Sequence, residues 1–301
     1  MRTAATPIRT TPNPLEKLLL IPFLLLLPAA GRSSGPLQRV SSFSTIPNPD
    51  ISLTNLNGTV VVRGWTESRV HAVYTMATPR IEIDATSLPD SGEAQKIELA
   101  THLLDPALRG AAARVDYTMD VPIGSSVEIR NPQGVVRVER LNGDTWIASV
   151  GSSIVVSDAS GEVVARSVGG QIQIVRSSGY VEVSSVTGDL RFTSPMSSRI
   201  HASTSSGQIF YEGNLIPSAE YIMETYSGDI DVICPRSSSF ELAARSVQGK
   251  VVHELKVNRR LHHRSVSAYG NALYGTHNEG AARLELTSFR GNIYLRPEPQ
   301  Q

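Results

Sequence analysis

The sequence predicts an all-β fold, a flattened β-solenoid in which coils of 18 to 21 residues each contribute two strands. Glycine recurs every 8 to 10 residues in the middle of the chain, at Gly134, Gly143, Gly151, Gly161, Gly170, Gly179 and Gly188. Further on the spacing becomes 21 residues, at Gly207, Gly228, Gly249, Gly270 and Gly291. Apolar-x-apolar triplets such as VRV, IQI and VEV follow most of the earlier glycines, and the chain is 40% hydrophobic but 6% aromatic. Such a core is built mainly from Val, Ile and Leu, and β-branched residues favour strands.

Residues 1–31 are typical of a secretory signal peptide. Arg2, Arg9 and Lys17 precede an apolar stretch at 18–28, which small residues follow. That stretch is about a dozen residues long, whereas a membrane-spanning helix needs about 20. We therefore expect an exported protein of the periplasm, cell surface or medium, with no stable transmembrane segment once the signal is cleaved. The alternative is an uncleaved N-terminal anchor.

The rest of the chain divides into a linker at 32–44, a solenoid domain at 45–297 and a short tail at 298–301. Within the solenoid, residues 77–114 break the glycine pattern. The stretch TSLPDSGEAQKIELATHLLDPALRGAAA is richer in Pro, Ala and acidic residues than its surroundings. It predicts a loop or a short helical excursion.

The stretch SSGYVEVSSVTGDLRF, residues 177–192, contains two alternating runs, each introduced by Ser or Thr and then Gly. The two runs are interpreted as the two sides of one coil, with Val183 facing the core and Glu182 facing solvent. One coil cannot bury its apolar face alone, so coils stack about 4.8 Å apart. The alternative is an antiparallel meander with hairpins at the same glycines, because alternation does not distinguish the two.

Charge and cysteine content exclude several classes of protein. The chain has 28 basic and 28 acidic residues, so no field favours nucleic acid as a partner. Cys234 is the only cysteine, which rules out an intramolecular disulfide. It ends an apolar run, and we expect a buried, inert thiol.

Asp144, Asp189 and Asp229 each follow a glycine of the repeat, and stacked acids at one corner are able to bind a hard cation. Other coils place different residue types at this position, including Lys250. We therefore expect solvated corner residues and predict no metal site, no cofactor and no catalytic residue.

One coil departs from the pattern, NRRLHHRSVSAYGNALYG at 258–275. It has His263, Ser265 and Ala272 where other coils have inward apolar residues. It also contains three arginines that form a candidate patch for an anionic ligand: Arg259, Arg260 and Arg264. The alternative is a loosely packed coil without a ligand.

Three segments carry a family resemblance: ISLTNLNGTVVVRGWTESRVHAVYTM (51–76), VDYTMDVPIGSSVEIRNPQGVVRVERLNGD (115–144) and ARLELTSFRGNIYL (282–295). Together with the glycine repeat they resemble the bacterial β-strand-repeat proteins called "putative adhesins", also catalogued as DUF4097. The resemblance covers roughly residues 45–297. It implies a secreted or envelope-attached β-solenoid with no established catalytic residues.

Two functions therefore stand first: a module that binds a surface polysaccharide or an envelope protein, and a structural envelope protein that mainly stacks or assembles. A polysaccharide-active enzyme is the third. Exposed aromatic side chains favour a glycan platform. Tyr180, Tyr211, Tyr226 and Tyr294 are too scattered in the sequence to decide between these functions.

Overall fold

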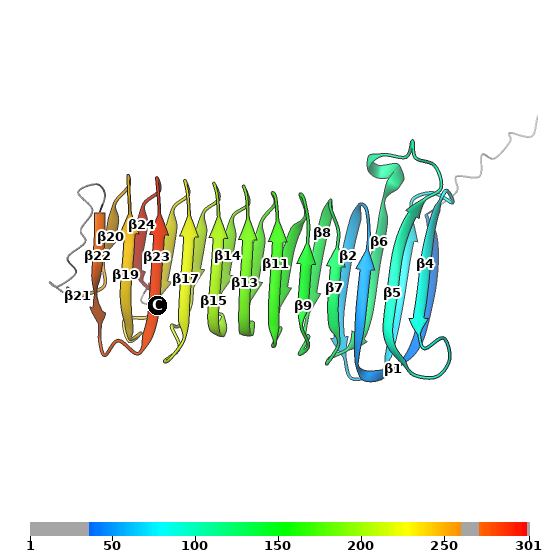
Figure 1. The fold of residues 1–301 in the computed structure, drawn as a ribbon, viewed down its shortest axis with the longest axis horizontal. Helices are drawn as coiled ribbons and strands as arrows, with labels where there is room; N and C mark the ends of the chain where they lie inside the picture. Colours follow the sequence, from blue (N-terminus) through cyan, green and yellow to red (C-terminus); the bar gives the residue numbers. More distant parts are fainter. Residues whose placement is uncertain (1–35, 260–270, 300–301) are drawn as a thin grey trace, which may run out of the picture. The chain divides into compact units, whose positions relative to one another are not determined.

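Two stacked β-sheets form the body of the protein (Figure 1). The computed structural model describes residues 36–259 and 271–299, all of which belong to one compact unit, Ser34–Gln301. The described part contains 24 strands and one short 3-10 helix, so the predicted all-β solenoid is confirmed.

Each central coil contributes one strand to each sheet. Sheet B contains β7 (Ser126–Arg130), β9 (Thr145–Ala148), β11 (Glu162–Ser167), β13 (Ser178–Ser185), β15 (Met196–Thr204) and β17 (Glu220–Thr225). Sheet A contains β8 (Gly134–Glu139), β10 (Ser153–Ser157), β12 (Ile172–Val175), β14 (Leu190–Thr193), β16 (Ile209–Glu212) and β18 (Ile230–Cys234). Within each sheet, strands of successive coils pair in parallel.

Alternate side chains of the two sheets meet in a shared apolar interior. Val181 and Val183 of β13 are at most 1% exposed, and Leu190 and Phe192 of β14 are fully buried. The stretch SSGYVEVSSVTGDLRF therefore does form the two sides of one coil. Val183 faces the core as predicted, and Glu182 lies on the outer surface, where it pairs with Arg166.

The last coil of the chain lies between two earlier coils. This last coil consists of β23 (Ala282–Ser288) and β24 (Ile293–Pro297). The coil before it in the sequence consists of β19 (Phe240–Ser246) and β20 (Val251–His253). β23 pairs with β17 on one side and β19 on the other, while β24 separates β18 from β20. Figure 1 shows β23 in red between yellow β17 and orange β19. The coils therefore do not stack in sequence order.

The segment expected to form an unusual coil at 258–275 instead contributes to a hairpin. β22 (Asn271–His277) runs antiparallel to β19 and to the short β21 (Asn258–Arg259). Ala272 pairs with the outward Arg245 and is exposed, whereas Leu273 is buried, so the expected inward position of Ala272 is wrong. Because β22 runs antiparallel to β19 and not parallel like a coil strand, its inward residues differ from those that the glycine spacing predicted. His263 and Ser265 lie outside the described residues.

The N-terminal end combines antiparallel and parallel pairs of six strands: β1 (Leu37–Thr54), β2 (Gly58–Trp65), β3 (Arg69–Met76), β4 (Ile81–Leu88), β5 (Ala94–Leu103) and β6 (Val115–Pro122), with a 3-10 turn at Gly110–Ala113. The first half of β1 pairs with β3 in sheet A, and its second half lies between β5 and β7 in sheet B. β6 lies between β3 and β2.

Two expectations about this end are wrong. Residues 37–44 of the expected linker at 32–44 are the first half of β1, and most of 77–114 is the β4–β5 hairpin rather than a loop or helix. Ile81 and Ile83 on β4 and Ile97 and Leu99 on β5 are buried at a spacing of two residues, which is the period of a strand. Pro and acidic residues around these positions made the period of two hard to recognise in the sequence. Parallel coils thus form the middle, while antiparallel hairpins occur at both ends.

Among the residues that the structure describes, no helix has the length and apolar character needed to cross a membrane.

Candidate functional site

Nine four-residue corners join a sheet B strand to the next sheet A strand. Each has Asn, Ser or Thr first, and all but one end in Gly: 55–58, 131–134, 149–152, 167–170, 185–188, 204–207, 225–228, 288–291 and 246–249. In a representative corner, Thr225 Oγ1 accepts the N–H of Gly228 at 3.0 Å and donates to the Gly207 carbonyl of the neighbouring coil at 3.2 Å. A Cβ on Gly207 would lie 2.0 Å from the Gly188 carbonyl oxygen. The corners are therefore structural, because hydroxyl and glycine together fix the contact between coils.

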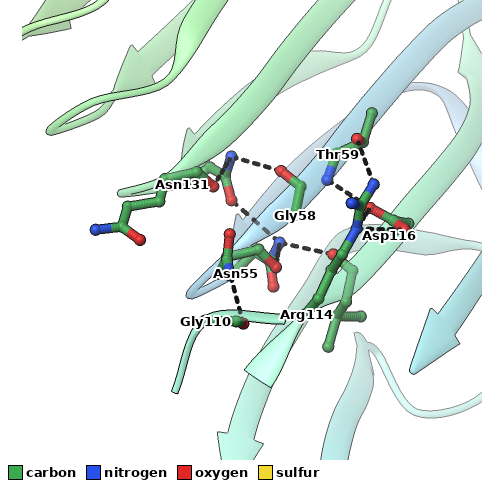
Figure 2. A network of polar contacts seen from close by, with 10 residues as sticks. Asn55, Gly58, Thr59, Gly110, Arg114, Asp116 and Asn131 are labelled. Carbon is green, nitrogen blue, oxygen red and sulfur yellow. Dashed lines mark hydrogen bonds and ion pairs between the residues drawn. The ribbon is translucent and has the colours of Figure 1, made fainter. Parts of the chain in front are cut away.

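Asparagine replaces the hydroxyl at the two N-terminal corners (Figure 2). Asn55 Nδ2 donates to the Val115 carbonyl at 3.0 Å and to Asn131 Oδ1 at 3.1 Å. Asn131 Nδ2 in turn donates to the Gly58 carbonyl and to Ser152 Oγ, each at 3.2 Å. Both amides are fully buried, and their partners are all protein groups. This network stabilises the corner and presents nothing to a ligand.

An exposed ion pair adjoins the buried amides in Figure 2. Arg114 Nε donates to both carboxylate oxygens of Asp116, at 3.0 and 2.9 Å, and the same carboxylate accepts the N–H of Thr59 at 2.7 Å. Asn57 Nδ2 donates to the Gly110 carbonyl at 2.8 Å. These contacts tie the segment before β6 to the start of β2.

The three corner acids are divided between two sides of the solenoid. Asp189 Oδ1 accepts the N–H of Gln208 at 2.8 Å, and Asp229 Oδ1 accepts that of Asn292 at 2.7 Å, both where the chain enters sheet A. Asp144 lies where the chain enters sheet B. Each acid caps a backbone donor of the next coil, and the three do not form one stack.

The second corner position forms a line that is apolar except at Ser205, here named the corner ridge. In coil order its members are Leu56, Pro132, Val150, Val168, Val186, Ser205, Tyr226, Phe289 and Val247. Val150, Val168 and Val186 are 46 to 54% exposed, and the rings of Tyr226 and Phe289 stack at 4.9 Å. This is a recurring outward feature, which the sequence analysis did not identify.

A hollow of about 270 Å³ lies on the outer surface of sheet B, across the adjacent strands β5, β1, β7 and β9. It is here named the Trp146 hollow. Its lining includes Lys96, Asp50, Ser52, Ser126, Glu128, Asp144 and Trp146. Ser52 and Ser126 form a low floor on the two middle strands, because their side chains are smaller than those on either side.

Only part of the polar lining of the hollow is engaged with other protein groups. Lys96 Nζ lies 2.5 Å from Glu98 Oε1, and hydrogen bonding to Glu98 raises the pKa of Lys96. Glu128 pairs with Arg130, whose guanidinium lies 5.4 Å from the centre of the Trp146 ring. Asp144 Oδ1 accepts the N–H of Glu162 at 3.1 Å.

The side chains of Asp50, Ser52 and Ser126 make no hydrogen bond or ion pair within residues 36–259 and 271–299. The exposed Asp50 lies between Lys96 and Ser126 in the sheet register. Free acceptors and hydroxyls therefore converge beside a partly exposed indole. That arrangement is able to bind a polyhydroxylated ligand by stacking and hydrogen bonds.

The side chains of the predicted anionic-ligand patch lie outside the described part of the structure, so the patch stays a prediction. Arg259 belongs to β21, and its side chain is not described; Arg260 and Arg264 lie outside the described residues. Cys234 is fully buried as predicted, and burial raises the pKa of its thiol to about 11. Tyr211 is buried too, so the tyrosines named from the sequence do not share a surface.

The Trp146 hollow was missed because its residues come from separate parts of the sequence. The one available signal was Trp146 itself, a large aromatic at an outward position of a short strand, TWIA. The strands that complete the hollow are β1 and β5, and β5 fell in the segment expected to be a loop.

Comparison with known proteins identifies the family. A family model described as "Toastrack DUF4097" matches residues 118–296, more than half of the chain. The crystal structure of a "putative cell adhesion protein" from Clostridium sporogenes ATCC 15579 aligns with 87% of this chain and 100% of its own, at 13% identity and a TM-score of 0.25. No curated protein sequence matches. The chain belongs to the DUF4097 (Toastrack) family.

Proposed function

We propose that this protein is a non-enzymatic binding module of the cell envelope that engages a surface polymer through the outer face of sheet B. The observation that carries the proposal is the Trp146 hollow, where an indole adjoins polar side chains that make no hydrogen bond or ion pair in the part of the chain that the structure describes. The solenoid supplies a rigid support, since every strand beneath the hollow is paired on both sides.

The absence of catalysis is part of the proposal. A glycosidase needs two carboxylates in acid and base or nucleophile roles. In the hollow, Glu128 is held by Arg130 and Asp144 by the N–H of Glu162. Both are committed to other protein groups, which favours binding over bond cleavage.

Export is the second part. The proposal rests on the basic, apolar and small-residue order of residues 1–31. Intact-mass measurement of the native protein should give a mature chain that begins near Arg32, and cell fractionation should place it outside the cytoplasm. A native protein that retains residues 1–31 would contradict cleavage and favour an N-terminal anchor.

Purified protein screened on envelope polysaccharides tests binding and catalysis together. We expect retention of the protein on at least one polymer and no release of new reducing ends. Release that a single Asp or Glu substitution abolishes would establish an enzyme instead. Absence of retention on every polymer would contradict the polymer-binding proposal.

A second candidate function is assembly, which the corner ridge favours. Exposed apolar rows of this length mark interaction surfaces, and this one contains no acidic residue. If assembly is the function, the protein should self-associate during light-scattering chromatography, and Val168→Asp with Val186→Asp should abolish this. Gln133→Asp, exposed in another corner of the same series but off the ridge, is the control. A monomer at all concentrations would rule assembly out.

A further inference from the structure

We propose that the Trp146 hollow binds one unit of a non-acidic polysaccharide, a neutral or amine-bearing sugar, with Trp146 stacked on the sugar ring and Asp50 accepting hydrogen bonds from its hydroxyl or ammonium groups. This inference rests on the proposed function and names the ligand class for it.

Trp146 supplies the apolar contact. The apolar face of a sugar ring packs on aromatic side chains, and indole offers the largest surface for it. The only other tryptophan, Trp65, belongs to a different surface, and its indole N–H donates to the Arg69 carbonyl at 2.8 Å. The Arg130 guanidinium near the Trp146 ring restricts its orientation, which lowers the entropy lost on binding.

Asp50, Ser52 and Ser126 supply the polar contacts. A carboxylate only accepts hydrogen bonds, whereas a hydroxyl both donates and accepts. Because none of the three makes a hydrogen bond or a close ion pair among the described residues, ligand hydroxyls would gain these bonds without breaking a protein hydrogen bond.

Charge excludes acidic sugars. Around the hollow, four carboxylates (Asp50, Glu98, Glu128, Asp144) stand against two cations (Lys96, Arg130), which gives a formal charge of −2. Lys96 and Arg130 are already paired with Glu98 and Glu128. A uronate or phosphate would meet net repulsion here, whereas a neutral sugar meets none and an ammonium group is attracted.

The size of the hollow fits part of a chain. Its volume of about 270 Å³ is just below the range of small-molecule pockets, which begins at about 300 Å³. It spans four strands, about 14 Å along the stack at the usual strand spacing. It lies on an open sheet face, so a polymer is able to enter and leave over the neighbouring coils.

Calorimetric titration with three defined probes tests the inference: a glucosamine hexamer, a cellulose-derived hexamer and a galacturonate hexamer. We expect binding of one or both of the first two and at least tenfold weaker binding of the third. Trp146→Ala should weaken binding about tenfold or more, and Asp50→Asn should weaken the glucosamine hexamer most. Tyr180→Ala, an outward aromatic on the same sheet beyond the hollow, should bind like the wild type.

A third hollow variant tests the site without changing Trp146 or Asp50. Ser126→Gln fills the floor of the hollow and should also weaken binding, with unfolding temperatures confirming that every variant remains folded. Binding unaffected by all three hollow variants, or preference for galacturonate, would overturn the inference while leaving a polymer-binding module. If no hexamer binds but an envelope polymer retains the protein, the ligand class is wrong and the proposed function stands. Retention on no polymer overturns both.

Discussion

Glycine has a direct steric role at the corners. A Cβ at Gly207 would lie 2.0 Å from the Gly188 carbonyl oxygen, whereas at Gly151 a Cβ would meet nothing within 4 Å. Both residues are in corners that join sheet B to sheet A. The difference arises because the 149–152 corner ends in Ser152, so Gly151 occupies the outward third position.

Gly207→Ala should therefore lower the free energy of unfolding by on the order of 3 kcal/mol, because backbone of an adjacent coil must move. Gly151→Ala should change it by less than about 1 kcal/mol in the stabilising direction, through lower entropy of the unfolded chain. Urea unfolding measures both. Equal effects would show that the coils are not in the contact described here.

Val183 and Glu182 test the strand register. Val183→Asp places an unpaired carboxylate among apolar side chains and should prevent folding or cost about 4 kcal/mol. Glu182→Ala removes a partly exposed ion pair with Arg166, 2.8 Å long, and should cost no more than about 1 kcal/mol. Thermal unfolding followed by circular dichroism distinguishes the two. A larger loss of stability from Glu182→Ala than from Val183→Asp would show that Glu182, and not Val183, faces the core.

Cys234 should resist thiol reagents in the folded protein. Burial raises the pKa of its thiol from 9.0 to about 11, so the thiolate fraction near pH 8 falls about a hundredfold. Complete lack of solvent exposure slows the reaction further. Labelling at pH 8 should be slow without denaturant and fast with it. Fast labelling of the folded protein would contradict the burial of β18.

At the scale of strands and coils, the sequence predicts individual elements well and their order poorly. Period-two alternation and glycine spacing identify the coils, as for β13 and β14. The spacing of 21 residues also gives the correct register, since Gly228 adjoins Gly291 and Gly291 adjoins Gly249. Each coil presents the same backbone and small corner residue to its neighbours, so nothing in the repeat says which coil comes next.

Disulfide trapping tests the order of the coils. In a Cys234→Ser background, Asp231→Cys with Tyr294→Cys joins directly paired residues of β18 and β24 and should cross-link. Asp231→Cys with Val252→Cys joins strands two spacings apart, about 9.6 Å, and should not. Stacking in sequence order predicts the opposite result. Electrophoresis without reductant shows which pair forms.

At the scale of the whole solenoid, the proposed binding surface depends on a similar reordering of strands at the N-terminal end. β1 lies between β5 and β7, so Asp50, Lys96 and Ser126 become neighbours although they are far apart in the sequence. Local patterns predict which of these residues face outward. They do not predict that β5 joins sheet B, and hence could not predict the Trp146 hollow.

Removing the last coil should affect the entire C-terminal part. A chain ending at Asn278 lacks β23 and β24, so β17 and β19 lose their shared partner, as do β18 and β20. We expect aggregation or a broad, low-temperature unfolding transition. Removing only residues 299–301 should leave unfolding unchanged. A cooperative transition at the original temperature in the shorter chain would contradict the placement of this coil.

The position of the last coil also constrains the order in which the protein can be completed during synthesis. Coils from β7 to β18 are able to stack as they emerge, each on the one before. The strands from β19 to β22 emerge next, yet β19 and β20 pair in the finished stack with β23 and β24. That pairing becomes available only after residue 297 has left the ribosome. Completion thus depends on the arrival of the coil of β23 and β24, and a chain that stops before it is left with unpaired strand edges.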